Sequence, residues 1–204
     1  VITSAAQTGT VTELADNAVG ENTATLSTTG AVSFSDVDTL DIHSATVTPQ
    51  GAGYLGSLTL AAVNQGTDTV GWIFSVADGA LDNLQAGQTL TQTYAVQVSD
   101  GHGGTATQNV VITLTGTNDA PVITSAAQTG AVTELADNAA GENTATLSTT
   151  GAVSFSDVDT LDIHSATVTP VGSGYLGTLT LAAVNQTTDT VGWTSSVSDG
   201  ALDN

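Results

Sequence analysis

The stretch TVGWIFSVADGALDNLQAGQTLTQTYAVQVSDGHGG, residues 69–104, decides the fold class. Apolar and small or polar residues alternate in two rows within it, and Gly, Asn and Asp separate the rows. The rows consist of Val70, Trp72, Phe74 and Val76, and of Tyr94, Val96 and Val98. A period of two, with β-branched and aromatic residues on one side, is typical of strands that bury one face. The stretch therefore predicts two strands in a β-rich chain.

The same alternation continues outward in both directions. Further inward rows are formed by Val32 and Phe34, by Ala45 and Val47, by Leu58, Leu60 and Ala62, and by Val110, Ile112 and Leu114. A first strand covers about residues 1–13 and is divided near Ala6. Seven or eight short strands with turn signals between them predict an all-β chain of Ig-like or cadherin-like Greek-key β-sandwiches. Within this pattern Trp72 is expected to be a core residue and not a platform for sugars, and Tyr94 is a candidate for a tyrosine corner.

The chain is an internal repeat with a period of 121 residues. Residues 1–83 align without a gap with 122–204 and differ at nine positions. We interpret 1–121 as one complete repeat and 122–204 as a second copy that lacks its last two strands, the counterpart of 84–121, with both chain ends as fragment ends. Near-identical tandem copies favour a spacer or fibre over an enzyme.

The differing positions include one in the core row of the clearest strand. Ser195 replaces Phe74 there. Replacing a buried aromatic with a small polar residue costs roughly 3–5 kcal/mol, so we expect the second copy to be the less stable one.

The charge balance is one-sided. The chain has 20 Asp and Glu, no Lys or Arg, three His and no Cys, so its formal net charge is −20. A nucleic acid or an anionic membrane surface is excluded as a partner because both require basic residues. The sequence contains no apolar run of 18 residues, so it predicts no membrane span in this segment. Self-repulsion of the compact state is relieved by bound cations, and carboxylates prefer hard ones such as Ca²⁺.

The acids cluster at predicted strand ends. They fall in TELAD (12–16), SDVDTLD (35–41), ADGALD (77–82), SDG (99–101) and GTNDAP (116–121). A single Asp-x-Asp is a weak signal, whereas the ordered set in a chain without basic residues is a strong one. Carboxylate, amide and backbone oxygens together are the ligand set of Ca²⁺.

These motifs also carry a family resemblance. The runs GTNDAPVI, VTELAD, SFSDVDTLDIH, GYLGSLTL and WIFSVADGALDNLQAGQTLTQTYAVQVSDGHGG resemble the VCBS repeat of large bacterial adhesins related to RTX adhesins, over essentially the whole chain. More distantly, the chain is similar to the cadherin repeat, whose linker of the form D-x-N-D-N-A-P binds calcium between modules. TNDAP at 117–121 matches that linker except for one Asn.

The resemblance implies calcium ligands at the junction of the two copies and a half-site at the start of the chain. The junction set is Asp100, Asn118, Asp119, Glu134, Asp157 and Asp159, together with Asp162 as the third acid of its motif. The half-site is Glu13, Asp36 and Asp38, together with Asp41. The missing Asn reduces the expected number of ions at the junction to one or two.

Other acids and the histidines are less informative. Asp78 and Asp82, with their copies Asp199 and Asp203, either bind a second ion or cap a surface turn. His43 and His164 follow Asp-x-Asp motifs, and we expect each to hydrogen-bond a nearby carboxylate.

The function that the sequence favours is a structural extender of a secreted bacterial surface adhesin or extracellular matrix filament, stiffened by Ca²⁺ and adjoining further copies of the repeat. One alternative is the subunit of a polymerising filament, in which strands of another chain complete the second copy. Another is a carbohydrate- or ice-binding module with a Thr-rich face, although we expect no regular T-x-T ladder. A glycosidase that uses Asp36 and Asp38 is disfavoured, and we expect no enzymatic activity.

Overall fold

The computed structural model describes residues 1–203, which form two compact units. The first unit comprises Val1–Ala120 together with Val158–Thr160, and the second comprises Pro121–Asp157 together with the chain from Leu161 onward. No helix in the described part of the chain is long and apolar enough to cross a membrane.

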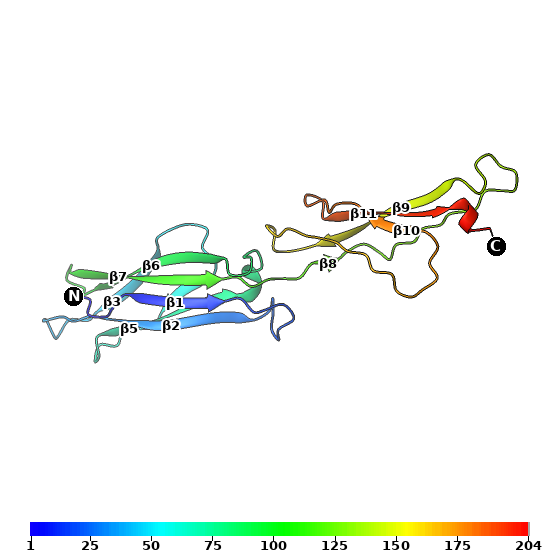
Figure 1. Ribbon diagram of the computed structural model, residues 1–204. Helices are drawn as coiled ribbons and strands as arrows, with labels where there is room; N and C mark the ends of the chain where they lie inside the picture. The colour runs from blue at the N-terminus through cyan, green and yellow to red at the C-terminus, as the bar shows by residue number, and fades with distance from the viewer. Residues whose placement is uncertain (204) are drawn as a thin grey trace. The chain divides into compact units, whose positions relative to one another are not determined.

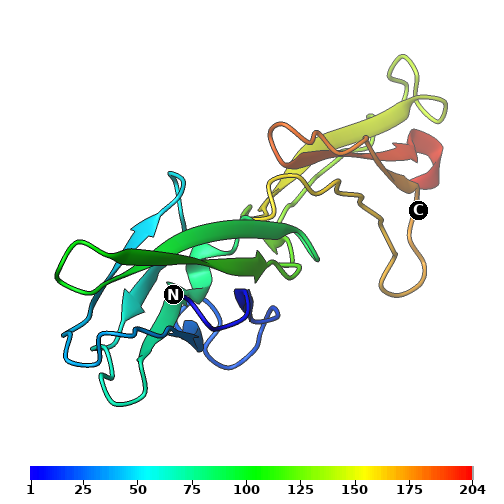
Figure 2. The same cartoon turned by 90° about the vertical axis from the view of Figure 1, so that its left-hand side faces the viewer.

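The first unit contains a four-stranded sheet (Figure 1). Its order is β1 (Gln7–Thr12), β7 (Thr105–Thr115), β6 (Thr89–Ser99) and β3 (Ser44–Pro49). β1 pairs with β7 in parallel, and the other neighbours are antiparallel. The hairpin β6–β7, green in Figure 2, forms the middle of this sheet.

A three-stranded sheet with the order β2 (Thr25–Ser33), β5 (Thr69–Ala77) and β4 (Ser57–Leu60) completes the first unit. A short 3-10 helix, η1 (Asp78–Ala80), follows β5. Ile2 pairs with Phe34 at the end of β2, whereas β1 joins the other sheet. The predicted division of the first strand is therefore confirmed, and the arrangement is that of an Ig-like or cadherin-like β-sandwich.

The predicted inward rows form the core between the two sheets, except that Ala62, expected in the row of Leu58 and Leu60, lies beyond the end of β4 and is exposed. Their centre is Trp72, which is 1% exposed and donates a hydrogen bond from Nε1 to Oε1 of Gln7 at 3.2 Å. The core role expected for Trp72 is confirmed. Further core residues with exposed fractions of 0–6% are Val32, Phe34, Leu58, Val70, Phe74, Val76, Tyr94, Val96, Val98, Val110, Ile112 and Leu114.

The hydrogen bonds of the tyrosines correct the expectation for Tyr94. The hydroxyl of the buried Tyr94 has no hydrogen-bond partner, and instead Tyr54 donates to the carbonyl of Thr93 and accepts from its N–H, each at 3.1 Å. Tyr94 is therefore not a tyrosine corner; its ring packs against that of Tyr54.

The expectation that threonines form no regular ladder is also wrong. On the solvent face of the four-stranded sheet, cross-strand pairing aligns threonines of β1, β7 and β6 in rows. One row is Thr10, Thr113 and Thr91, and the next is Thr12, Thr115 and Thr89. Alternation along each strand brings these residues to the same face.

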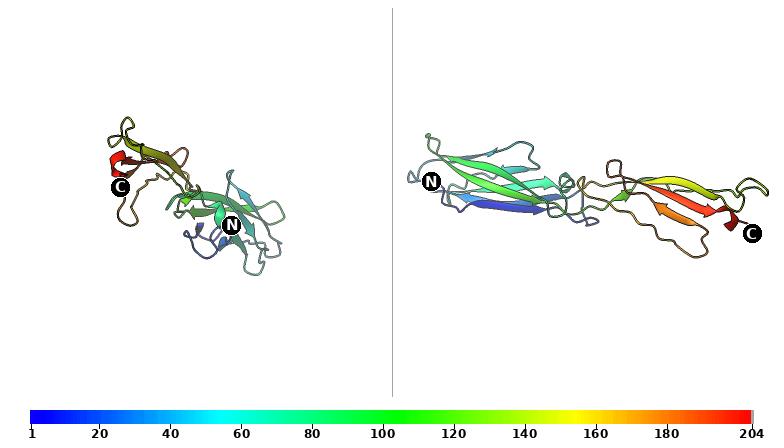
Figure 3. Two further views of the ribbon diagram at one scale, coloured as in Figure 1. Left: turned by 90° about the vertical axis from the view of Figure 1, so that its right-hand side faces the viewer. Right: turned by 45° about the horizontal axis from the view of Figure 1, so that its top comes forward.

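The second unit has one continuous layer of strands (yellow, red and orange in the right-hand view of Figure 3). Its order is β10 (Thr178–Leu181), β11 (Thr190–Ser198), β9 (Thr146–Ser156) and β8 (Val122–Ile123). A 3-10 helix, η2 (Asp199–Ala201), follows β11. Residues 128–133 and 165–170, the counterparts of β1 and β3, are not strands here.

Candidate metal centre

Three carboxylates meet at one end of the first unit. Glu13, Asp82 and Asp119 each bring one oxygen within 4.8 Å of the other two. Glu13 follows β1 and Asp119 lies beyond β7, and because these strands are parallel their ends lie at the same end of the sandwich. Asp82 comes from the loop after η1.

Glu13 is 4% exposed, which is unusual for an ionisable side chain. Its Oε2 accepts a hydrogen bond from the backbone N–H of Thr117 at 2.7 Å. Its Oε1 is buried and has no hydrogen-bond partner. A buried carboxylate oxygen without a partner is costly, and a cation is one way to satisfy it.

Asp119 connects this cluster to a second set of acids. Its side chain is 8% exposed, and its Oδ2 is buried without a hydrogen-bond partner. It also groups with Asp16 and Glu21 within 4.8 Å. Its backbone N–H donates to Oδ2 of Asp159, a residue grouped with the first unit, at 2.9 Å.

The electrostatics of the cluster oppose full ionisation. Burial raises the pKa of Glu13 to about 7; the Thr117 N–H lowers it, and the carboxylates of Asp119, Asp82 and Asp78 raise it further. Burial also raises the pKa of Asp119 to about 6, with Asp82 and Asp159 as the main charged neighbours. The protein has no Lys or Arg to neutralise the cluster. Near pH 7 it therefore holds either protons or an external cation.

The donor set fits a hard divalent cation. All the donors are oxygens, two of them are buried and unsatisfied, and three come from segments far apart in the sequence. Ca²⁺ accepts such ligands in flexible geometry and completes its shell with water. Glu13, Asp82 and Asp119 are the residues that would hold it.

Asp78 lies close to the cluster but has a different role. It is fully buried, and its two oxygens accept hydrogen bonds from the N–H groups of Leu14 and Asn22, both at 2.8 Å. Asp199 makes the same two bonds with Leu135 and Asn143 in the second copy. Of the two alternatives for Asp78, these bonds favour the structural one, since they fasten the loop after the first strand.

A second acidic group lies at the opposite end of the first unit. It consists of Asp36, Asp41 and Asp100, which bring oxygens within 4.8 Å of one another. The expected placement of Asp100 beside Asp119 is wrong, because β6 runs antiparallel to β7 and ends where β7 begins. The expected half-site of Glu13 with Asp36 and Asp38 is wrong for the same reason: Glu13 lies at the other end.

Each acid of this second group already has a partner, and that of Asp41 is the ring of His102, whose Nδ1 lies 3.5 Å from Asp41 Oδ1. Asp100 accepts hydrogen bonds from the N–H groups of His102 and Gly104, which lower its pKa. The N–H of Asp38 and then the ring of His43 lower the pKa of Asp36. His43 Nε2 lies 3.1 Å from Asp36 Oδ2, so the expected pairing of His43 with a carboxylate is confirmed.

The remaining predicted ligands are placed as follows. Asp38 and Asn118 are exposed, and the Asn118 amide donates to the carbonyl of Asp119. Glu134 shares a hydrogen bond with Asp203 in its own copy, which raises the pKa of Glu134, and its expected place beside Asp119 stays a prediction. Asp157 pairs with His164 at 2.9 Å, as expected for His164, and Asp162 is half-buried.

Sequence reasoning did not assign Asp16 and Glu21 to any site and left Asp82 undecided. The parallel pairing of β1 with β7 is the signal that unites them with Asp119. In an Ig-like sandwich, a first strand that changes sheets near Ala6 pairs in parallel with the last strand. This division of the strand could therefore have placed Glu13 and Asp16 at the same end of the first copy as Asp119.

No protein-family model matches the chain, and no curated protein matches it. Among solved structures it is similar to AggA, the major subunit of aggregative adherence fimbriae type I from Escherichia coli, at 16% identity over 57% of this chain and 94% of that chain, with a TM-score of 0.36. It is also similar to zebrafish RET cadherin-like domains 1 to 4, at 12% identity over 98% of this chain and 44% of that chain, with a TM-score of 0.32.

Proposed function

We propose that this chain is a non-catalytic extender of an extracellular bacterial surface or matrix protein, and that Ca²⁺ held by Glu13, Asp82 and Asp119 stiffens it. The observation that carries the proposal is the pair of buried, unsatisfied oxygens, Glu13 Oε1 and Asp119 Oδ2, in a cluster of like charge. The resemblance of the sequence motifs to VCBS repeats supports the extracellular setting.

The three ligands belong to segments that only the fold brings together. Thr117 orients Glu13 through its N–H, and its hydroxyl donates to the carbonyl of Leu14 at 2.9 Å. The segment after β7 is thereby attached to the loop after β1. Bound Ca²⁺ supplies the positive charge that lets the three carboxylates ionise together. Without it, like-charge repulsion loosens this end of the unit.

Calcium titration of the chelator-treated chain tests the proposal. We expect binding heat and a rise in the thermal midpoint, because a ligand that binds only the native state stabilises it by about 2.7 kcal/mol at a hundredfold excess over Kd. Asp119→Asn and Glu13→Gln should weaken this response. At pH 8 without calcium, both variants should melt at or above the wild-type temperature, since each removes a repelling charge.

The matched control is Asp68→Asn, which removes one charge outside both acidic groups at a turn where φ is +49° and Asn is well tolerated. Its calcium response should equal that of the wild type. If the wild type shows neither heat nor a midpoint shift, the calcium role is wrong. An equal loss in all three variants would assign the effect to net charge alone.

The threonine rows favour carbohydrate binding as a second candidate. They present hydroxyls on a sheet face whose strands contain no charged residue. Co-sedimentation with insoluble cellulose and chitin tests this candidate, with Thr91→Val and Thr113→Val as variants that keep the β-branched shape. Retention of wild type but not of the variants would support it, and equal pellet fractions with and without polysaccharide would exclude it.

A further inference from the structure

The outer face of the four-stranded sheet carries a two-dimensional array of threonines. β1, β7 and β6 lie side by side, and each presents every second residue on this face. Cross-strand pairing orders these residues into three rows, namely Thr10–Thr113–Thr91, Thr12–Thr115–Thr89 and Thr8–Val111–Thr93. Eight of the nine positions are threonine, and the ninth, Val111, is β-branched as well. The array therefore has a uniform side-chain shape.

The side chains of the array face solvent in a fixed arrangement. Those of the flanking strands β1 and β6 are exposed except for Thr93, and those of the central strand β7 are half-buried. A β-branched side chain has few χ1 rotamers in a strand. Each threonine thus presents a hydroxyl and a methyl group that are ordered before anything binds, which lowers the entropic cost of binding.

The spacing of the array is set by the geometry of the sheet. Neighbouring strands lie about 4.8 Å apart, and alternate residues of one strand lie about 6.7 Å apart. Both distances are close to repeats of the oxygen lattice on the prism faces of hexagonal ice. Twist rotates each flanking strand by roughly 20° relative to β7, and over the two rows of Thr113 and Thr115 this displaces the corner hydroxyls by about 1 Å. Two rows on three strands therefore stay close to the lattice.

The charge of this face matches a neutral crystalline partner. No residue of β1, β3, β6 or β7 is charged. Ice excludes ions from its lattice, whereas a hydroxyl both donates and accepts hydrogen bonds as a water molecule does. The one aromatic residue of these strands, Tyr94, is 2% exposed and faces the core, so sugar rings find no aromatic surface here on which to stack.

We propose that this face binds ice. The hydroxyls of the Thr113 and Thr115 rows take oxygen positions at the surface of the crystal, and the methyl groups fill the spaces between them and lose their contact with liquid water. The ligand is crystalline water, held by one side of the sandwich. The array contains none of the proposed metal ligands, so ice binding and calcium binding are tested separately.

Partition of the full 204-residue chain into ice tests the proposal. A single ice crystal that grows slowly from a dilute solution excludes proteins that do not bind it, and the protein inside the crystal is measured by its Trp absorbance. We expect the wild type to be enriched in the ice severalfold over a non-binding acidic protein of similar size. The enrichment should be the same in calcium and in chelator.

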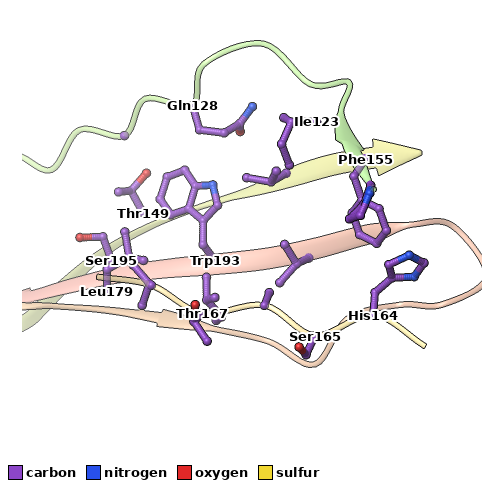
Figure 4. Close-up of a pocket in the computed structure, with 17 residues that line it drawn as sticks. Ile123, Gln128, Thr149, Phe155, His164, Ser165, Thr167, Leu179, Trp193 and Ser195 are labelled. Carbon is purple, nitrogen blue, oxygen red and sulfur yellow. The ribbon is translucent and has the colours of Figure 1, made fainter. Parts of the chain in front are cut away.

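The matched pair of variants is Thr113→Tyr and Thr29→Tyr. Thr29 is exposed on β2 of the other sheet, and its neighbour Thr28 faces the core. The copy of Thr28 in the second unit, Thr149, lies beside Trp193 in Figure 4. Tyrosine suits a strand in both places, but in the middle of the array it holds the crystal away from the neighbouring hydroxyls. Thr113→Tyr should reduce the enrichment to that of the non-binding protein, and Thr29→Tyr should leave it unchanged.

Two further variants change the array with little effect on folding. Val111→Thr completes the third row and should increase the enrichment. Thr10→Ala introduces the residue found at the equivalent position 131 of the second copy and should decrease it. Hydrogen exchange of the β6 and β7 amides verifies that each variant is folded.

Enrichment that follows the array in this way supports the proposal. It is overturned if the wild type enters ice no more than the non-binding protein, or if the two tyrosine variants lose enrichment equally. Retention of the wild type by cellulose or chitin together with its exclusion from ice would assign the rows to carbohydrate and also overturn it.

Discussion

Buried carboxylates in this protein have two different fates that depend on their hydrogen bonds. Both carboxylate oxygens of Asp78 accept hydrogen bonds from backbone N–H groups, and these bonds hold the loop after β1 in place. Glu13 has one oxygen satisfied by Thr117 and one without a partner. A satisfied buried carboxylate needs nothing further, whereas an unsatisfied one near other carboxylates favours protonation or a bound cation.

At the residue scale, this difference predicts a pH dependence of stability. The pKa of Glu13 is about 7 in the folded chain and ordinarily 4.5. Between these values the folded state keeps a proton that the unfolded state releases, so stability falls as pH rises through this window. Without calcium, Glu13 and Asp119 should make the chain less stable at pH 8 than at pH 5 by roughly 1–3 kcal/mol.

Urea unfolding at the two pH values, in chelator and in excess calcium, measures this effect. Glu13→Gln is the control, because the raised pKa values of His43 and His164 also reduce stability as pH rises and remain in the variant. Calcium should reduce the loss in the wild type only. The same pH dependence in both proteins would show that Glu13 titrates normally.

At the scale of the element, strands here depend on their partners. Ser44–Pro49 pairs with β6 and is a strand. The identical sequence at 165–170 pairs with no strand and is not a strand itself. Local propensity is the same in both places, so pairing decides the difference. β2 pairs with β5 in the first copy, and their counterparts β9 and β11 are also strands and pair in the second.

The packing of β2 against β5 depends on a glycine. A Cβ on Gly30 would lie 2.3 Å from Cζ2 of Trp72, whereas a Cβ on Gly71, which pairs with Ala31 in the same ladder, would meet nothing closer than 3.6 Å. Gly30→Ala should therefore displace the Trp72 ring and destabilise the first unit by about 1–3 kcal/mol. Gly71→Ala should be close to neutral.

Hydrogen exchange of β5 amides in the full chain separates these outcomes, because it reports the first unit by itself. Gly30→Ala should speed exchange throughout β5, and Gly71→Ala should not. Equal effects of the two substitutions would mean that the cost comes from glycine replacement in general and not from the indole.

At the scale of the whole molecule, all 20 acids lie outside the strands. The strands are uncharged, and the loops together with the two short 3-10 helices carry the entire charge of −20. Many of these carboxylates are exposed and hydrated, which limits their repulsion, whereas Glu13 and Asp119 are buried in one cluster. We therefore expect inorganic cations to affect the stability of this protein by general screening and, under the proposed function, also by binding at the Glu13 cluster.

Thermal melting in chelator tests the screening component. Raising NaCl from about 20 mM to about 500 mM shortens the Debye length severalfold and should raise the midpoint by several degrees. Millimolar calcium should exceed the effect of NaCl at equal ionic strength, and Asp119→Asn should abolish only that excess. A midpoint that does not respond to NaCl would show that the loop charges are already too far apart to interact.

The sequence by itself determined the repeat and, in the first copy, the strands and most of the inward rows, because alternation with a period of two is visible in neighbouring residues such as Val70, Trp72 and Phe74. It also placed acids at strand ends. Only the tertiary structure decided which ends meet. The parallel pairing of β1 with β7 unites Glu13 with Asp119, and the reversal between β6 and β7 sends Asp100 to the opposite end. Strand direction is a relation between distant segments, and local alternation contains no record of it.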